Sequence, residues 1–376
     1  INMKLQCTQE NLDKALSNIS RAVANRTTLP ITQNVLLKAN NGKLQLSATN
    51  LEMAINTWIG CEISDEGETT IPARIFTDLI KSYPNDNIDL NLNNNNLIIK
   101  CGPYNSNLIT QSSEEFPPIP ESDSLDPTFI ISPSSFSKLI NSVIFSAAQD
   151  QSRPVLTGVK FSITNNKLTL ATADGFRLSI ISFELENENI PEIDFIVPAK
   201  SLLEVSRILP FTKDDVSVFM TKASNQVIFK MDNYQLTTVL TQGNFPDFNS
   251  LIPDSNSTSC IIPKINFKSA VRSLGVLAKD GNGIIRLEIS GSEQNQNLLM
   301  SSKTDELGEN SVILEINSSG QDSKIAFNSK YLSDVLDVID GENVILEING
   351  DSNPGLIKPE NNSEYIHIVM PMFVQW

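Results

Sequence analysis

Histidine is almost absent from this chain of 376 residues, which contains only His367. One histidine cannot form a multi-histidine metal site, and a Ser-His-Asp catalytic site would have to include it. Cysteine is also scarce, and Cys7, Cys61, Cys101 and Cys260 form no Cys-x-x-Cys pair. This spacing is typical of reduced, buried thiols in a cytosolic protein and argues against a disulfide framework or a zinc site. We therefore expect no bound metal.

Positive charge and long apolar runs are also in short supply. The chain has 28 Lys and Arg against 44 Asp and Glu, a net charge of −16, so the molecule as a whole should repel nucleic acid and anionic membranes. No apolar stretch approaches the roughly 18 residues of a membrane span. The N-terminus has no basic-then-apolar segment of the secretory type. With 40% hydrophobic residues, we expect a soluble cytoplasmic protein with true hydrophobic cores.

The chain repeats itself at a period of about 125 residues, which is too long for a solenoid and suits duplicated domains. Residues 41–50 align with residues 165–174, and both contain a turn signal followed by an alternating strand pattern. Chance recurrence of common core patterns would not keep several landmarks in the same order. The other matching landmarks are residues 71–73 with 197–199, residues 116–117 with 245–246, and, in a more diverged third copy, residues 327–330 and 370–371.

Each copy predicts two helices separated by short strands. Leu12, Ala15, Leu16 and Ile19 follow the i, i+3, i+4, i+7 spacing of an amphipathic helix, and the other copies repeat it. Thr8 stands where a helix N-cap is expected. The predicted helical windows are residues 8–26, 72–82, 134–148, 198–208, 264–279 and 328–338. We therefore expect an α+β protein of three pseudo-repeated domains, at residues 1–125, 126–254 and 255–376.

The positive charge is concentrated in these six windows. They hold 13 Lys and Arg against six acids, whereas the remainder of the chain holds 15 bases and 38 acids. Surface helices often carry bases because these residues favour helices, but the net positive charge of the six windows taken together, against a strongly acidic remainder, indicates a common electropositive surface. Phosphate neutralisation by such a surface is independent of sequence, and no zinc-finger or RRM motif indicates base readout. The candidate DNA-binding residues are Lys14, Arg21, Arg26, Lys81, Lys138, Lys200, Arg207, Lys264, Lys268 and Arg272.

Four segments carry a resemblance to a known family: residues 28–37, 171–178, 243–247 and 369–372. Together with the repeat, they make the chain similar to the bacterial sliding clamp family, the beta subunit of DNA polymerase III, from Met3 to about Phe373. The resemblance implies three clamp domains, each with two helices packed on antiparallel sheets, that form half of a closed ring.

The resemblance also implies a function. A head-to-tail homodimer would encircle double-stranded DNA without sequence preference and tether the replicative polymerase, the clamp loader and other proteins that carry a clamp-binding motif. Such a processivity factor has no catalytic residues, no cofactor and no membrane partner.

The same resemblance implies a partner-peptide pocket between the second and third domains, with Arg153 and Arg177 on its rim. As bare chemistry the pocket is an apolar set with two adaptable methionines. The chain departs from the family pattern at Ala173, Ser250, Phe373 and the tail 374–376, which affects peptide preference. The pocket residues carried over are Arg153, Leu156, Ala173, Gly175, Arg177, Leu178, Pro246, Leu251, Ile368, Met370, Pro371 and Met372.

In the expected homodimer, domain 1 of one chain meets domain 3 of the other. Residues 104–110 are predicted to form an edge strand in domain 1. In domain 3, Val276 and Leu277 are expected to offer apolar contacts, and Asp305, Glu306 and Glu309 to face Arg74. The candidate interface residues are Arg74, Tyr104, Leu108, Val276, Leu277, Asp305 and Glu306.

Two other classes of protein remain as alternatives. A metal-dependent DNA-processing enzyme would use clustered acids such as Asp214 and Asp215, or Asp305 and Glu306. Adjacent residues of a strand point to opposite sides, and acids in turns are usually solvated, so this alternative is disfavoured. A protein-binding β scaffold would not need the segregated helix charge.

Overall fold

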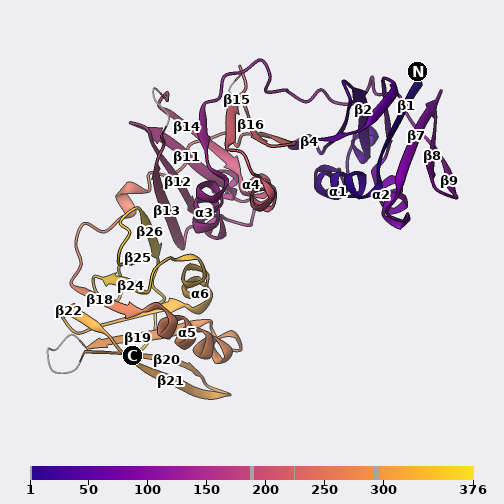
Figure 1. Ribbon diagram of the computed structural model, residues 1–376. Coiled ribbons are helices and arrows are strands. Elements are labelled where there is room, and N and C mark those ends of the chain that lie inside the picture. The colour runs from indigo at the N-terminus through magenta and orange to yellow at the C-terminus, as the bar shows by residue number, and fades with distance from the viewer. Residues whose placement is uncertain (1, 187–189, 224, 291–295) are drawn as a thin grey trace. The chain divides into compact units, whose positions relative to one another are not determined.

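The computed structural model describes residues 2–186, 190–223, 225–290 and 296–376. The chain forms two compact units, one of residues 1–134 and 200–240, the other of residues 135–199 and 241–376 (Figure 1). Each unit contains two sheets and helices that cover them, and each is described separately. The predicted boundaries of three domains, at residues 125 and 254, stay a prediction.

The first unit contains a five-stranded and an eight-stranded antiparallel sheet. In the larger sheet β17 (Tyr234–Val239) pairs with β4 (Met53–Gly60), so that Leu236 lies opposite Ile55. This pairing joins a strand of the first sequence repeat to a strand of the second. The five-stranded order is β5 (Glu62–Asp65), β1 (Asn2–Thr8), β7 (Asn87–Asn93), β8 (Asn96–Cys101) and β9 (Tyr104–Ile109). The eight-stranded order is β10 (Phe129–Ile131), β15 (Val216–Met220), β16 (Gln226–Met231), β17 (Tyr234–Val239), β4 (Met53–Gly60), β3 (Lys43–Thr49), β2 (Asn34–Asn40) and β6 (Gly67–Pro72).

Three α-helices belong to this unit: α1 (Gln9–Ile19), α2 (Ala73–Ser82) and α4 (Ala199–Ile208). The Thr8 hydroxyl accepts a hydrogen bond from the Asn11 N–H, so Thr8 is the N-cap that the sequence predicts. α1 continues into the 3-10 turn η1 (Ser20–Ala22), and α4 into η5 (Leu209–Phe211). A further 3-10 turn, η2 (Pro30–Gln33), precedes β2.

The second unit contains a nine-stranded and a four-stranded antiparallel sheet. β13 (Arg177–Glu184) pairs with β26 (Tyr365–Val369), which brings Leu178 opposite Ile368. The nine-stranded order is β14 (Ile193–Pro198), β11 (Gly158–Thr164), β12 (Lys167–Ala173), β13 (Arg177–Glu184), β26 (Tyr365–Val369), β25 (Gly355–Pro359), β24 (Asn343–Ile348), β18 (Thr258–Pro263) and β22 (Asn317–Gly320). The four-stranded order is β21 (Gly308–Glu315), β20 (Asn297–Thr304), β19 (Ile284–Ser290) and β23 (Ser323–Asn328).

The helices of this unit are α3 (Pro133–Val143), α5 (Lys264–Lys279) and α6 (Ser329–Val338). α3 begins at Pro133, whose fixed φ suits the first helical position. Short 3-10 turns occur at η3 (Ile144–Ser146), η4 (Pro154–Thr157) and η6 (Asn249–Leu251). The six predicted helical windows therefore all contain an α-helix within the described residues, which confirms the two-helix repeat.

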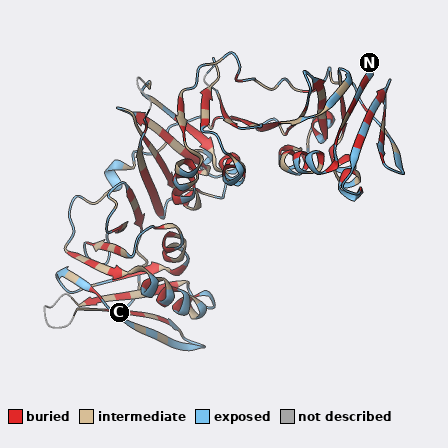
Figure 2. Cartoon of the chain, in the orientation of Figure 1, coloured by how far each residue is buried: buried red, intermediate tan, exposed pale blue. Residues whose placement is uncertain are grey.

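Buried residues recur along the strands and helices of both units (Figure 2). Phe76, Phe136 and Phe267 occupy helices of the three repeats, and all three are fully buried. The four cysteines are free thiols. Burial raises the pKa of Cys7 and of Cys260 to about 12, so both thiols stay protonated and unreactive.

Candidate functional site

A cluster of apolar side chains lies where β13 and β26 pair in the second unit. Ala171, Leu178, Ile180 and Ile368 are buried against one another, and we call these four residues the β13–β26 cluster. The structure thus brings together two residues that the sequence assigns to the pocket, Leu178 and Ile368. Further apolar residues pack around the cluster and are only partly buried: Ala173, Phe245, Phe248, Ile252 and Ile366.

Several apolar side chains beside this cluster are left exposed to solvent. Met370 is 41% exposed, and its N–H donates to the Phe176 carbonyl at 2.8 Å, which holds Met370 next to the turn that precedes β13. Phe176 itself is exposed. Leu251 is exposed in η6, between Phe248 and Ile252, which both pack on the cluster. Exposed apolar side chains gathered around a buried apolar cluster are typical of an interaction site.

Arg177, which the resemblance assigns to the rim of the pocket, has a buried side chain, and its part in peptide binding stays a prediction. Its side chain is only 6% exposed, and it donates to Asp174 Oδ2 at 3.0 Å and to Asp334 Oδ2 at 2.6 Å. It also donates to the Phe145 carbonyl and lies over the Tyr331 ring, 4.5 Å from the ring centre. These partners offset the cost of burying a guanidinium group. Arg177 therefore connects β13 to α6.

The turn from Asp174 to Arg177 is fixed by its own hydrogen bonds. Asp174 Oδ1 accepts the N–H groups of Phe176 and Arg177. Arg153 is exposed, as expected for a rim residue, and its Nη2 donates to the Asp174 carbonyl at 3.1 Å. Gly175 has φ +93°, and a Cβ there would lie 2.7 Å from Arg153 Nη2. The positive φ therefore favours glycine at this position, and a Cβ would also require the flexible Arg153 guanidinium to shift.

The other predicted pocket residues differ in how far they are buried. Leu156 is buried in η4, outside the β13–β26 cluster. Pro246 is exposed, whereas Pro371 and Met372 are half-buried. The Met372 N–H donates to the Ala326 carbonyl of β23 at 2.8 Å, so residues 370–372 run from the turn before β13 to the edge of β23.

The last residues of the chain continue along the four-stranded sheet. The Trp376 ring lies over Lys324 and Arg286, whose charged groups are 5.4 Å and 6.0 Å from its centre. Trp376 therefore rests on cations of β23 and β19. Phe373 is 85% exposed.

His367 is a buried structural residue of β26. Its Nδ1 lies 2.8 Å from the Ser179 hydroxyl, and both side chains are fully buried. Burial, together with the nearby Arg177 charge, lowers the pKa of His367 to about 3, so the imidazole is neutral at physiological pH. This Ser–His pair is inaccessible to any substrate, which argues against hydrolytic chemistry at His367.

The ten candidate DNA-binding residues differ in their charge partners. Arg21 and Arg207 both pair with Glu204, Lys138 pairs with Asp340, and Lys268 pairs with Asp337. Lys264 Nζ donates to the Ile339 carbonyl. Lys14 lies over the Phe211 ring. The remaining four are exposed, and none of the ion pairs formed within the described residues includes them: Arg26, Lys81, Lys200 and Arg272.

In each unit, one of the two sheets has an edge strand with exposed apolar side chains. β9 is the edge of the five-stranded sheet, as the sequence predicts for residues 104–110, and Tyr104 and Ile109 are exposed on it. β21 is the edge of the four-stranded sheet, and Ile313 is exposed on it. Sequence reasoning missed Ile313, although its position in an alternating strand pattern was a usable signal. Of the domain 3 candidates, Val276 is exposed on α5, and Asp305 and Glu306 are exposed in the turn between β20 and β21.

The acids of the enzyme alternative lie in exposed loops. Asp214 and Asp215 precede β15, and Asp305 and Glu306 precede β21. Within the described residues, no group of three or more His, Cys, Asp or Glu side chains is placed to hold a metal ion. The helices of the described ranges also include none that is both long and apolar enough to cross a membrane.

Comparison with known proteins defines the class to which this fold and site belong. Residues 3–120, 130–247 and 249–373 match, in order, the N-terminal, central and C-terminal domains of the DNA polymerase III beta subunit. The protein is therefore built of three clamp domains, and its function is that of a DNA sliding clamp. The chain belongs to the DNA polymerase III beta subunit family, as the sequence resemblance predicts.

Individual relatives agree along the whole chain. The beta sliding clamp of Staphylococcus epidermidis is 30% identical, and the match covers 95% of this chain and 96% of that protein. The crystal structure of the DNA polymerase sliding clamp from Bacillus subtilis superimposes with a TM-score of 0.95 at 25% identity, covering 100% of both chains. A Pseudomonas aeruginosa sliding clamp bound to griselimycin superimposes with a TM-score of 0.90 at 27% identity, also covering 100% of both chains.

Proposed function

We propose that two copies of this chain form a head-to-tail ring that encircles duplex DNA. The ring tethers the replicative polymerase, the clamp loader and other motif-bearing proteins through the surface around the β13–β26 cluster. The observation that carries the tethering role is the buried apolar cluster with exposed apolar neighbours at its border, among them Met370 and Leu251. This assignment makes the chain a non-catalytic subunit without a cofactor, acting in the cytoplasm where bacterial DNA is replicated.

The exposed edge strands support the proposed ring. Pairing β9 of one protomer with β21 of the partner would satisfy the unpaired backbone groups of both edges, which otherwise favour aggregation. It would also cover Ile109 and Ile313, which are both exposed. Because the two edges differ, the contact between protomers is heterologous. A heterologous contact repeated around a rotation axis produces a closed ring of subunits. In this arrangement Asp305 and Glu306 supply negative charge opposite Arg74.

DNA is held by long-range charge rather than by tight contacts in this proposal. Arg26, Lys81, Lys200 and Arg272 lack carboxylate partners within the described residues, so their charges are available to phosphates. Arg21, Arg207, Lys138 and Lys268 are partly neutralised by acids and contribute less. Each phosphate neutralised adds about 0.9 to the salt-dependence slope. Weak, screened contacts of this kind hold a ring on DNA while allowing it to slide.

The peptide partner that fits the pocket carries a glutamine and two bulky apolar residues. The apolar side chains would enter beside Leu178, Pro246 and Met370, and the polar side chain would meet backbone groups near Met372. Burying two such side chains contributes about 3–6 kcal/mol before ordering costs. Single-site affinity is therefore expected in the micromolar range. Ala173 and Ser250 change the lining relative to the family pattern, and we expect them to alter peptide preference more than the existence of the pocket.

Two measurements test this proposal separately. Light scattering at micromolar concentration should give twice the 41.4 kDa mass of one chain, and a purely monomeric protein would contradict the ring. Calorimetric titration with a peptide of the stated chemistry should give one site per chain. Failure to bind any such peptide while the dimer forms would remove the tethering role and leave the ring intact.

A further inference from the structure

A hollow of about 670 Å³ lies in the first unit between α1 and α4, beside the turn that joins β16 to β17. Lys14 and Arg21 reach it from α1 and η1, and Arg207 reaches it from α4. Aromatic residues complete the lining, among them Phe211 and Tyr234. The Tyr234 hydroxyl accepts a hydrogen bond from Asn18, which fixes the ring at the border of the hollow.

Phe211 is the unusual residue of this hollow. Its side chain is 74% exposed, whereas most phenylalanines bury their rings. Lys14 Nζ lies 6.0 Å from the centre of the Phe211 ring, at the outer limit of a cation–π contact. The ring is therefore an open platform flanked by positive charge.

The cations that line the hollow are only partly paired with carboxylates, so an anion could bind them. Glu204 pairs with both Arg207 and Arg21, and the Arg21 contact is loose at 3.6 Å. The Asp232 carboxylate already accepts hydrogen bonds from the backbone N–H groups of Lys213 and Asp214, which lie just before β15. Lys14 has no carboxylate partner within the described residues, so Lys14 and the loosely held Arg21 are the cations best able to meet a phosphate.

We infer that this hollow binds an unpaired nucleotide of single-stranded DNA, with the base stacked on Phe211 and the adjacent phosphate held by Lys14 and Arg21. An exposed aromatic ring among cations is the chemistry by which proteins bind single strands without sequence preference. Duplex DNA cannot stack a base on the Phe211 side chain, because its bases are already stacked on one another. This ligand is additional to the duplex of the proposed function, and its binding does not require ring closure.

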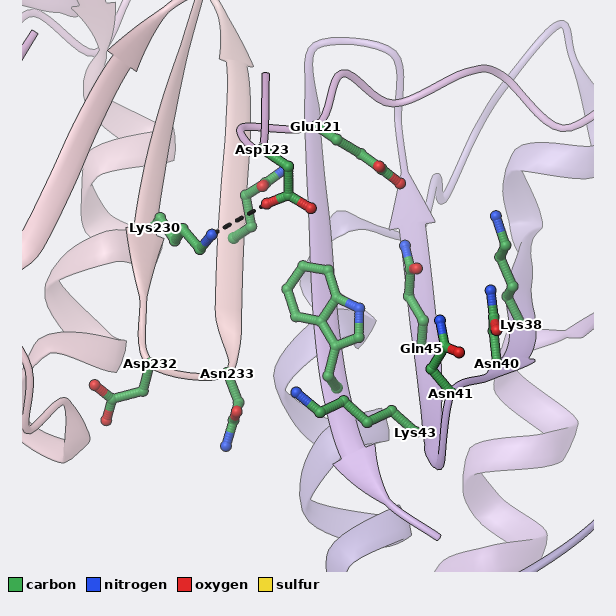
Figure 3. Close-up of a pocket in the computed structure, with 12 residues that line it drawn as sticks. Lys38, Asn40, Asn41, Lys43, Gln45, Glu121, Asp123, Lys230, Asp232 and Asn233 are labelled. Carbon is green, nitrogen blue, oxygen red and sulfur yellow. Dashed lines mark hydrogen bonds and ion pairs between the residues drawn. The ribbon is translucent and has the colours of Figure 1, made fainter. Parts of the chain in front are cut away.

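A neighbouring hollow of about 480 Å³ is a weaker candidate (Figure 3). It shares Asp232 and Asn233 with the first hollow. Lys230 is turned toward Asp123, with which it forms an ion pair at 3.2 Å. Glu121 adds further negative charge there, and none of the residues that line this hollow is an exposed aromatic residue comparable to Phe211. The contrast favours the hollow at Phe211 for a nucleotide.

The inference is tested by fluorescence anisotropy of the full chain with a labelled oligo(dT) of about 12 nucleotides, a length within the site sizes of single-strand binding folds. Phe211→Ala should weaken binding about 5- to 150-fold, as expected for the loss of one stacked base. Phe211→Trp should retain or strengthen binding. Phe373→Ala removes an even more exposed phenylalanine from the other unit and serves as the control, with no change expected.

Retention of Phe211→Ala on circular duplex DNA separates this inference from the proposed function. We expect retention on circular duplex DNA to be unchanged, because duplex DNA does not stack on the Phe211 side chain. Oligo(dT) binding that is undetectable in the unmodified chain, or unchanged in Phe211→Ala, would overturn the inference. An equal loss of single-strand and duplex binding in Phe211→Ala would also overturn it, since Phe211 would then serve the duplex.

Discussion

Replacing Asp334 with Asn should destabilise the second unit and weaken peptide binding, although Asp334 is not part of the β13–β26 cluster. Arg177 Nη1 donates to Asp334 Oδ2 at 2.6 Å, and both side chains are largely buried. The amide keeps an acceptor but loses the charge, while Asp174 still pairs with Arg177. The loss should therefore be about 1–3 kcal/mol, less than the 3–5 kcal/mol expected when a buried charge loses its only partner.

The assay compares Asp334→Asn with Asp337→Asn, a matched control on the same helix. Asp337 pairs with Lys268 at 2.7 Å, but that pair is solvent-exposed and should contribute only about 0–1 kcal/mol. Denaturant unfolding gives the stability difference, and calorimetric titration gives the affinity for the peptide. We expect up to about tenfold weaker peptide binding for Asp334→Asn, because Arg177 also anchors the turn at Asp174. Equal effects of the two changes on stability and affinity would refute the role of the Arg177 network.

Three further outcomes are expected. Truncation before Met370 combined with Leu178→Ala should abolish peptide binding and leave the dimer intact; undiminished calorimetric binding would move the partner site elsewhere. Ile109→Glu should shift light scattering toward the monomer, because the charge lies on the exposed β9 edge, and an unchanged dimer would reject β9 as the interface. Burial lowers the pKa of His367 from 6.5 to about 3. Between these pH values the unfolded chain binds a proton that the folded chain does not, so the free energy of unfolding should fall by about 1.4 kcal/mol per pH unit below about pH 6. His367→Gln should flatten this slope in denaturant titrations at several pH values, and a wild-type slope in the variant would contradict it.

Much of the fold is predictable because each repeat contains local sequence patterns that specify its helices and strands. The helical spacing at Leu12, Leu16 and Ile19 and the N-cap at Thr8 act within one turn of chain, so sequence alone locates α1. The edge strand β9 is likewise predicted from its own residues. By contrast, the pairing of β17 with β4 depends on register between distant strands, and no local pattern specifies it.

The candidate site is less predictable for the same reason. Family matching identifies Leu178 and Ile368, and β13–β26 pairing then brings them together. The burial of Arg177 could not be anticipated, because its partner Asp334 lies 157 residues away in the sequence. The position of Trp376 over Arg286 and Lys324 also depends on tertiary contacts alone.

Retention on circular DNA, before and after linearisation, tests the central claim most directly. The protein is bound to a nicked circular duplex, freed of unbound protein by gel filtration, and assayed again after a restriction enzyme opens the circle. A ring held by topology should co-elute with the circle and be lost from the linear molecule, at a salt concentration that screens phosphate contacts. Equal retention on circular and linear DNA, or no retention on either, would contradict a clamp that encircles its substrate.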